Sequence, residues 1–398
     1  MIQTALGVLL WLGIFTLFYS YLGYALLTLI LTKLSFKKRL HQIKDFEPPV
    51  TLIIAAYNEE SIIEDKIANT FALDYPKDKL EILFVTDGSN DRTAAIVSGF
   101  AGVKLLHRDE RLGKSAALNR AVPLATHDIV IICDANTMLN TSCVRELVKY
   151  YADETVGGVS GEKKVLSAGG VVQQEGLYWK YESTLKKIDA GYQTVVGAAG
   201  ELFSFRKKLW TTLEQDTLLD DFMVSMHIVM KRYRVLYEPA AYAFETASAT
   251  VTDEAKRKVR IAAGGFQSIS RLLPMLNIFK YTRASLLYIS HRVLRWAVCP
   301  FAMVFVLAAN FFLVLMNGGL VYQLLLGAQL LFYGIALLYS FPFMKRIKMP
   351  LAPTVYYFVF MNVCVIRGFF RFLKGGQKAT WEKATRQVMM AEKSSTVS

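Results

Sequence analysis

The feature that most constrains this chain is a long apolar stretch near its N-terminus. From Thr4 to Leu34 the only charged residue is Lys33. About thirty residues of this kind are enough for one tilted membrane-spanning helix. A cleaved signal peptide would have a shorter apolar region preceded by positive charge, whereas here Lys37-Lys38-Arg39 follows the stretch. We therefore predict an uncleaved anchor over residues 1–36, with the N-terminus outside and the following chain in the cytoplasm.

Two further apolar segments near the C-terminus predict a hairpin of membrane-spanning helices. They cover about Trp296–Met316 and Leu320–Phe341, and only Asn317-Gly318-Gly319 separates them. So short and uncharged a connection predicts a tight turn. The hairpin returns the chain to the side that carries Lys345-Arg346-Lys348, which suits the cytoplasmic face of a membrane.

A fourth apolar stretch, about Leu351–Ile366, allows two placements. If it crosses the membrane, Arg367, Arg371 and Lys374 lie outside, against the positive-inside tendency. A re-entrant or interfacial placement avoids that conflict. The segment before the hairpin, Arg271 to Arg295, mixes apolar and basic residues and fits an amphipathic helix on the membrane surface, with a plain cytosolic helix as the alternative.

The net charge of +13 does not indicate a nucleic-acid-binding protein. No run of Lys and Arg is interleaved with stacking aromatic residues, as a single-strand binding groove would require. The basic residues instead gather beside the apolar segments, a placement that suits an anionic membrane surface. The four cysteines show no CxxC spacing, so we interpret them as reduced, small apolar residues.

The middle of the chain, residues 46–265, predicts an α/β domain. Apolar runs alternate there with helix-like segments that begin near Asn58 and Asn90 and within Ser115–Ala121. Continuous apolar runs are typical of strands that are covered on both faces, and strand–helix alternation predicts a parallel sheet with right-handed crossovers. The predicted strands are Val50–Asn58, Leu80–Ser89, Val103–Leu106 and Asp128–Asn136.

Three acidic clusters follow one another along this domain. Asp87 and Asp134 each end an apolar run, and the pair Asp220–Asp221 precedes the apolar helix pattern Phe222–Val229. Side chains at the carboxyl ends of neighbouring parallel strands meet in one crevice, where open α/β sheets bind nucleotides. The order of the clusters therefore indicates a metal-assisted group transfer at a membrane surface.

Asp134 and Asn136 are candidate ligands of Mg²⁺ or Mn²⁺. Alternate residues of an extended segment face the same way, and hard oxygen ligands suit these ions when substrate phosphates complete the coordination shell. The alternative for Asp134 is a buried carboxylate held by the amides of a turn. Asp87 is placed to accept hydrogen bonds from a ribose or a base; helix capping is its alternative, for which Ser89 and Asp91 are better placed.

Lys114 and the pair Asp220–Asp221 are candidates for the chemical step. Lys114 lies in a loop ahead of a helix and could meet phosphate or the aspartates. Two adjacent carboxylates raise one pKa by repulsion, which makes a usable general base for a hydroxyl nucleophile. We assign Asp221 as the base and Asp220 as its neighbour, with helix capping as the alternative.

These motifs together resemble the membrane-bound family 2 glycosyltransferases, which include the synthases of cellulose, chitin, hyaluronan and poly-N-acetylglucosamine. The resemblance covers about Pro48 to Gly265 and extends to the membrane segments. It implies a GT-A fold and an inverting transfer from a nucleotide-sugar, most simply a UDP-sugar, to a glycan acceptor. The motifs, in chain order, are VTLIIAAYNEE, VTDGSNDRT, GKSAALN, CDAN and LLDDF.

The resemblance also implies roles for individual residues. The uridine pocket would be lined by Ala56, Tyr57 and Glu59 together with Asp87. Asp134 would serve the metal and the diphosphate, and Asp221 would be the catalytic base. The segment Gly197–Arg206, with Gly200 and Glu201, would shape the donor-sugar and acceptor site.

Two departures from the family pattern bear on the product. Asn136 stands where a second aspartate is usual, and Arg257-Lys258-Val259-Arg260-Ile261 stands where processive synthases carry Gln-x-x-Arg-Trp. Arg260 matches the arginine and could contact diphosphate, but the stacking tryptophan is missing. Tyr178 and Trp179 could stack on acceptor sugar or belong to the core. Processive polymer synthesis, with a possible export partner, and transfer to a lipid or polyprenyl-phosphate acceptor therefore both remain open, as does an inactive membrane scaffold.

The predicted organisation places a multi-pass protein in the inner membrane with its catalytic domain in the cytoplasm. Its predicted parts are a membrane anchor (1–36), a GT-A domain (46–265), amphipathic interfacial helices (266–295), a C-terminal membrane region (296–373) and a basic, partly disordered tail (374–398).

Overall fold

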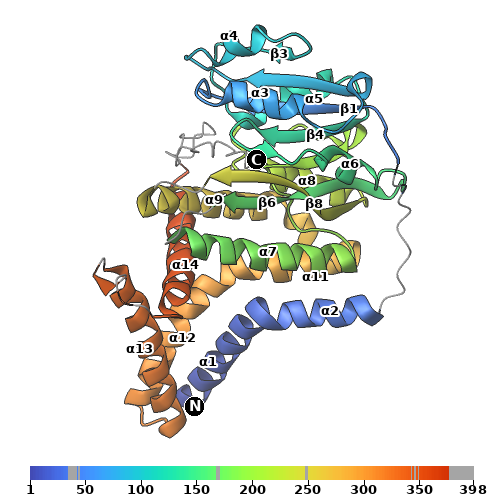
Figure 1. Cartoon of the computed structure of the whole chain (residues 1–398). Helices are drawn as coiled ribbons and strands as arrows, with labels where there is room; N and C mark the ends of the chain where they lie inside the picture. The colour runs from blue at the N-terminus through green and yellow to red at the C-terminus, as the bar shows by residue number, and fades with distance from the viewer. Residues whose placement is uncertain are drawn as a thin grey trace, which may run out of the picture.

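An α/β domain lies against a group of long apolar helices in this computed structural model (Figure 1). The structure describes residues 1–34, 43, 45–166, 171–246, 250–341, 343–344, 347 and 349–375. The basic clusters Lys37-Lys38-Arg39 and Lys345-Arg346-Lys348, and nearly all of the predicted tail, lie outside these residues.

The first half of the sheet contains the predicted parallel strands. They are β1 (Val50–Ala56), β2 (Leu80–Thr86), β3 (Lys104–Leu106) and β4 (Ile129–Asp134). β1 pairs with both β2 and β4, so that Ala56 lies opposite Thr86 and Ala55 lies opposite Asp134. Because the three central strands end at the same level, the residues that follow them meet at one edge of the sheet.

The second half of the sheet makes it mixed. β7 (Phe203–Arg206) runs antiparallel to β4, and β6 (Val156–Leu166) runs antiparallel to β7. β8 (Arg234–Thr246) is parallel to β6, and the short β5 (Met138–Leu139) pairs with β8. The strand order is β3-β2-β1-β4-β7-β6-β8-β5.

Helices cover both faces of this sheet, and a hydrophobic core lies on each face. Ile53 of β1 and Val130 of β4 belong to one core, whereas Leu52 and Ile131 belong to the other. This arrangement explains why the strands are apolar without alternation. The helices of the domain are α3 (Ile63–Phe71), α4 (Thr93–Ser98), α5 (Lys114–Leu124), α6 (Cys143–Val148), α7 (Val171–Tyr192), α8 (Asp220–Met230) and α9 (Val251–Arg271).

The first helix of the domain begins later than predicted. We expected it to start near Asn58, but α3 starts at Ile63. Asn58 has a φ of 53°, a left-handed conformation that does not continue into a right-handed helix. Its side-chain amide donates to Asn90 Oδ1 at 2.7 Å, and its backbone N–H donates to Ser89 Oγ at 3.1 Å. These contacts join the turn after β1 to the turn after β2.

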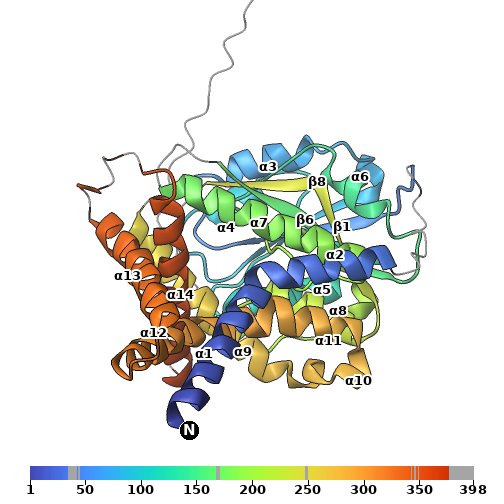
Figure 2. The same ribbon diagram turned by 90° about the horizontal axis from the view of Figure 1, so that it is seen from below.

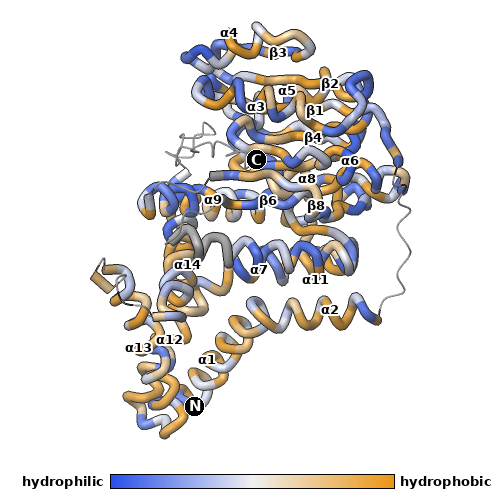
Figure 3. Tube along the Cα trace, viewed as in Figure 1, coloured by the Kyte–Doolittle hydropathy of each residue, from blue (hydrophilic) through white to orange (hydrophobic). Residues whose placement is uncertain are grey.

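Four helical runs among the described residues are long and apolar enough to span a membrane. They are Ile2–Leu34, Arg283–Leu315, Leu320–Ser340 and Ala352–Leu373. Their apolar residues show along the tube in Figure 3, and many of them, such as Leu12, Phe15 and Leu324, are exposed. Exposed apolar surface of this extent marks a site of interaction with a membrane or with another protein.

These runs agree with the predicted apolar segments in length and composition and refine their bounds; for the fourth, both a crossing and an interfacial placement stay open. The first contains α1 (Ile2–Phe18), the π-helical η1 (Tyr19–Gly23) and α2 (Tyr24–Leu34). The second contains α11 (Arg283–Tyr288), the π-helical η5 (Ile289–Val298) and α12 (Cys299–Leu315). The third is α13 (Leu320–Ser340) and the fourth is α14 (Ala352–Leu373). In Figure 2, α2 lies beside α7, while α1, α12, α13 and α14 lie to one side; α2 and α7 are in contact.

The segment Arg271–Arg295, predicted as one amphipathic helix on the membrane surface, contains two short helices and the beginning of a long helical run. The chain from 273 to 281 forms η4 (Leu273–Leu276) and α10 (Ile278–Tyr281), and the helical run Arg283–Leu315 then passes residue 295 without a break. Its polar residues His291 and Arg292 are buried and meet Asp189 and Glu182 of α7 at 2.6 and 3.1 Å. Protein carboxylates, rather than lipid headgroups, therefore cover this polar face.

Candidate active site

Asp87 fixes the loop that leads to Lys114. It follows β2, and its two carboxylate oxygens accept hydrogen bonds from the backbone N–H groups of Leu112 (3.1 Å) and Gly113 (2.6 Å). Gly88 has a φ of 66°, and a Cβ on it would lie 2.6 Å from Cβ of Arg111. Only glycine suits both the conformation and the close approach. The turn after β2 and the loop 111–113 are therefore held together at the strand ends.

The candidate base-binding residues lie at the same edge. Ala56 ends β1 and is buried. The guanidinium of Arg111 lies over the ring of Tyr57, 3.9 Å from its centroid. Glu59 is buried, and its backbone N–H donates to Thr93 Oγ1 at 2.8 Å. The stacked pair Tyr57–Arg111 gives this edge a flat, cationic surface that suits a nucleobase beside phosphate.

Lys114 joins two of the acidic clusters. It is the first residue of α5, and its Nζ lies 2.7 Å from Oδ1 of Asp134 and 3.2 Å from Oδ2 of Asp220. Burial by itself would lower the pKa of Lys114, but the two carboxylates raise it above its usual value. The side chain therefore stays an ammonium. Burial also raises the pKa of Asp134, against the opposing effect of Lys114.

Asp221 is the carboxylate whose titration is most useful for catalysis. It lies in the first turn of α8 beside Asp220. Burial of its carboxyl group, and then the charge of Asp220, raise its pKa to about 7. Gly200 lies against it, and a Cβ there would be 3.1 Å from Oδ2 of Asp221. The carboxylate therefore faces a segment that we expected, from the sequence, to shape the acceptor site.

Glu201 and Trp179 lie around one buried lysine. Nζ of Lys163 is 2.6 Å from Glu201 and also pairs with Glu245 of β8. The same ammonium lies 5.0 Å from the ring centroid of Trp179, which Lys258 approaches to 5.6 Å. Burial would raise the pKa of Glu201, but Lys163 holds it below its usual value. Glu201 therefore stays ionised near Asp221.

Arg260 of α9 belongs to the same region. Burial lowers the pKa of Arg260, and the nearby charges of Asp220 and Asp134 act in the opposite direction. The structure thus brings Lys114 and Arg260 to the same group of aspartates. The two cations offset two of the carboxylates, so the charge of a bound diphosphate requires a divalent cation as well.

Asp134 and Asn136 fit a divalent cation that is shared with a substrate. Oδ1 of Asn136 is buried without a hydrogen-bond partner among the described residues, two positions after Asp134. The described part of the chain contains no group of three or more His, Cys, Asp or Glu side chains suited to a metal. One carboxylate and one amide oxygen leave most of the coordination shell to phosphate oxygens and water, as is usual for Mg²⁺.

Comparison with known proteins decides the class of this domain. Residues 51–212 match the family described as glycosyl transferase family 2. The chain carries a family 2 glycosyltransferase domain. The mixed sheet confirms the GT-A fold that the motifs led us to expect.

The chain is similar to two staphylococcal enzymes and to one solved structure. It is 29% identical over 239 residues to poly-beta-1,6-N-acetyl-D-glucosamine synthase of Staphylococcus aureus, and 25% identical over 236 residues to that of Staphylococcus epidermidis. Each match covers 56% of this chain and 56% of the relative, so it spans little more than half of either protein. The mannosyltransferase PcManGT of Pyrobaculum calidifontis, solved with GDP-Man and Mn²⁺, superposes with a TM-score of 0.70 at 25% identity, over 92% of this chain and 99% of that one.

Several residues of the glycosyltransferase site were not identified from the sequence. Arg111 lies in the loop that we searched only for Lys114, and its stacking on Tyr57 depends on the Asp87 contacts. Lys163 and Glu245 lie on strands that we did not predict. Glu162–Leu166 contains three consecutive charged residues followed by two apolar ones, so it lacks the alternation that would predict a strand.

Substitution of Lys114 by Met should destabilise the glycosyltransferase in a pH-dependent way. Without the ammonium, the pKa of Asp134 rises further above its unfolded value. A carboxyl group whose pKa is higher in the folded state than in the unfolded state lowers the unfolding free energy as the pH rises above its pKa in the unfolded state. We expect a loss of roughly 2 kcal/mol in unfolding free energy at pH 8 and a smaller loss at pH 5. Thermal unfolding at both pH values measures this loss of unfolding free energy. The control is Lys208→Met, which replaces an exposed lysine. Equal losses at both pH values would exclude the ion pairs as the cause.

Proposed function

We propose that this protein is a membrane-bound, inverting glycosyltransferase that moves a sugar from a nucleoside-diphosphate sugar to a hydroxyl group of a glycan acceptor. The observation that carries the proposal is the convergence of Asp134, Lys114 and the pair Asp220–Asp221 at the ends of the central strands. A diphosphate leaving group needs cations on one side, and a hydroxyl nucleophile needs a base on the other. This site offers both.

In the proposed reaction, Asp221 removes the proton of the acceptor hydroxyl as its oxygen attacks the anomeric carbon. The bond between that carbon and the diphosphate oxygen breaks in the same step, and the nucleoside diphosphate leaves with the bonding electrons. Lys114 and Arg260 neutralise the charge that develops on the leaving group. A divalent cation held by Asp134 and Asn136 would add Lewis-acid stabilisation of the diphosphate. Burial, and then the charge of Asp220, raise the pKa of Asp221, so that it can accept a proton near neutral pH.

The nucleobase is proposed to stack at Tyr57 and Arg111, near Ala56, Glu59 and Asp87. The resemblance to polysaccharide synthases favours a UDP-sugar, whereas PcManGT was solved with GDP-Man. The proposed cation is Mn²⁺ or Mg²⁺. Mn²⁺ is the ion bound in PcManGT, and both ions suit the oxygen ligands of Asp134 and Asn136.

The acceptor is proposed to reach the site from the membrane side. Gly200 lies against Asp221, and Trp179 of α7 lies near Lys258 of α9. A growing exopolysaccharide is the product that the staphylococcal relatives suggest. Nucleotide sugars are cytoplasmic metabolites, so the domain is proposed to face the cytoplasm. The basic residues that follow the N-terminal span support this orientation.

The proposal is tested by supplying purified protein in lipid nanodiscs with UDP- and GDP-sugars, Mn²⁺ or Mg²⁺, and membrane extracts as acceptor. We expect release of one nucleoside diphosphate together with transfer of its sugar, and product size then distinguishes a polymer from a single addition. Failure to consume any donor, with the protein folded and the cation present, would contradict the proposed function.

A further inference from the structure

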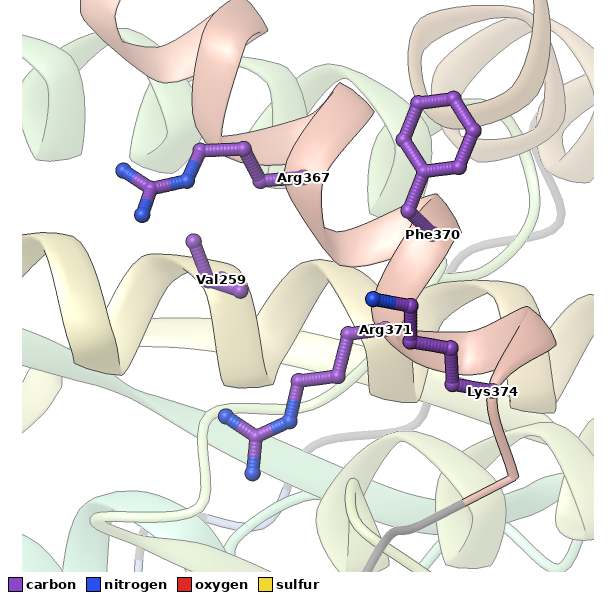
Figure 4. Close-up of a pocket in the computed structure, with 5 residues that line it drawn as sticks. All are labelled: Val259, Arg367, Phe370, Arg371 and Lys374. Carbon is purple, nitrogen blue, oxygen red and sulfur yellow. The ribbon is translucent and has the colours of Figure 1, made fainter.

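A cationic pocket lies between α9 and α14, outside the residues assigned to the reaction. Its volume is about 500 Å³, and its lining is Val259, Arg367, Phe370, Arg371 and Lys374 (Figure 4). Arg367 and Arg371 of α14 and Lys374 at its C-cap are spaced four and three residues apart, so they share one face of the helix. In Figure 4 the side chains of Arg367 and Arg371 extend from α14 across α9 on either side of Val259, whereas Phe370 points away.

The three cations of this pocket have no counter-ion among the described residues. All three side chains are exposed, and no ion pair or hydrogen bond joins them to a described residue. Like charges gathered on one helix face repel one another, so an anion bound between them is favoured. Two guanidinium groups and an ammonium are the side chains that recognise phosphate.

The walls of the pocket are held firmly in place. Gly368 of α14 packs so closely on α9 that a Cβ on it would lie 2.5 Å from Cβ of Ala262. The ring of Phe266 contacts Phe369 and Phe372, with centroids 5.1 and 6.2 Å apart. The pocket is therefore a preformed feature of the fold, and an anion that enters it needs little rearrangement of the helices.

The position of the pocket points to a lipid ligand rather than a free anion. It lies in the last turns of α14, a helix long and apolar enough to span a membrane, and Lys374 directly follows that span. Phe370 and Leu373 beside the cations are exposed apolar side chains. Basic residues at the end of a membrane helix lie at headgroup level. A ligand that fits has a phosphate next to a hydrocarbon chain.

The pocket also leads to the reacting groups. Val259 precedes Arg260, and the charges of both Arg371 and Asp220 act on Arg260. A phosphate in the pocket would thus lie beside the arginine that faces the aspartates. Such an arrangement would hold the phosphate end of an acceptor near the site while its hydroxyl or sugar reaches Asp221.

We propose that the pocket lined by Arg367, Arg371 and Lys374 binds the phosphate of a lipid-linked acceptor, such as a polyprenyl phosphate or diphosphate that carries the glycan. This inference rests on the proposed function, because it names the carrier of the acceptor. It assigns to the fourth membrane helix a part in substrate binding.

The test measures binding alone, so it does not depend on transfer activity. Protein in phosphatidylcholine nanodiscs is exposed to a photoactivatable polyprenyl phosphate, and cross-linked peptides are mapped. We expect labelling of α9 and α14 that unlabelled polyprenyl phosphate displaces. The double variant Arg367→Gln/Arg371→Gln should weaken it by roughly tenfold or more, while the affinity for nucleoside diphosphate stays within about twofold. The variant Arg371→Lys should keep more of the labelling than the double variant does, because it keeps the positive charge.

The matched control is Lys280→Gln, which removes an exposed cation of α10 outside the pocket and should label as the wild type does. Unchanged labelling of the double variant would overturn the inference. So would equal displacement by phosphatidylglycerol, which indicates a general anionic surface, or by inorganic phosphate, which indicates a free-anion site. If the double variant also loses affinity for nucleoside diphosphate, the pocket belongs to the donor site and the inference is wrong. If binding behaves as expected and no donor is consumed, the proposed function fails and this binding site remains.

Discussion

Asp221→Asn should abolish sugar transfer while the affinity for nucleoside diphosphate stays within a few-fold of the wild type. The amide keeps the shape of the carboxylate but cannot accept the proton of the acceptor hydroxyl. Loss of a positioned general base costs about 10²–10⁴-fold in rate. Transfer is measured as donor-dependent product formation, and affinity by calorimetric titration in the presence of Mn²⁺.

The same carboxylate gives the wild type a pH dependence of defined sign. Asp221 must be ionised to act as the base, and its pKa is raised to about 7. The rate of transfer at low acceptor concentration should therefore rise from pH 6 to pH 8 and then level off. Asp65→Asn serves as the matched control, because it removes an exposed carboxylate from the first turn of another helix, α3. Equal losses of transfer and of nucleotide binding in Asp221→Asn would remove Asp221 from the role of base.

Asp134→Ala should remove the metal dependence of nucleotide binding. In the wild type, Mn²⁺ should tighten binding of the nucleoside diphosphate, because the cation bridges Asp134 and the phosphates. The variant lacks the only carboxylate of the Asp134–Asn136 pair, so titrations with and without Mn²⁺ should coincide, and transfer should fall by at least about 100-fold.

The control for this substitution lies next to the same strand. Asp128→Ala removes an exposed carboxylate next to the opposite end of β4 and should leave the Mn²⁺ response as in the wild type. If Asp134→Ala still binds nucleotide more tightly with Mn²⁺ than without it, Asp134 is not a metal ligand. Both titrations use folded protein, which a matched thermal-unfolding curve establishes.

The first half of the sheet could be predicted from the sequence because its strands are covered on both faces. No polar residue interrupts the runs Leu52–Ala56 and Ile129–Cys133, and a polar residue follows within two positions of each run. The rules for parallel sheets then bring the residues after β1, β2 and β4 to one edge. The position of Asp87 and Asp134 could be expected for this reason.

The second half could not be predicted in the same way. β6 contains Gly157, Gly158 and Gly161, and its apolar residues do not follow a simple period. Its place in the sheet depends on pairing with β7 and β8, which are distant in sequence. A Cβ on Gly157 would lie 2.6 Å from side-chain atoms of Ile228 and Tyr233, so these glycines mark close packing rather than a loop.

The buried charges beneath the sheet were also beyond prediction. Glu182 of α7 meets Arg292 and Arg295 of η5 at 3.1 and 2.7 Å, far apart along the chain. Burial would raise the pKa of Glu182, but the arginines hold it well below its usual range. From the sequence, arginines between apolar residues indicated a helix on the membrane surface. Only the packing of α7 against that helix shows that they pair with protein carboxylates.

The configuration of the product at its anomeric carbon tests the central claim most directly. If Asp221 removes a proton in a single displacement, an α-linked donor must give a β-linked product. The one-bond coupling between C1 and H1 of the transferred sugar, measured by NMR, reports this configuration. We expect inversion, that is, a β-linked product; an α-linked product would exclude Asp221 as the base of a single displacement, because retention does not arise from one displacement by the acceptor.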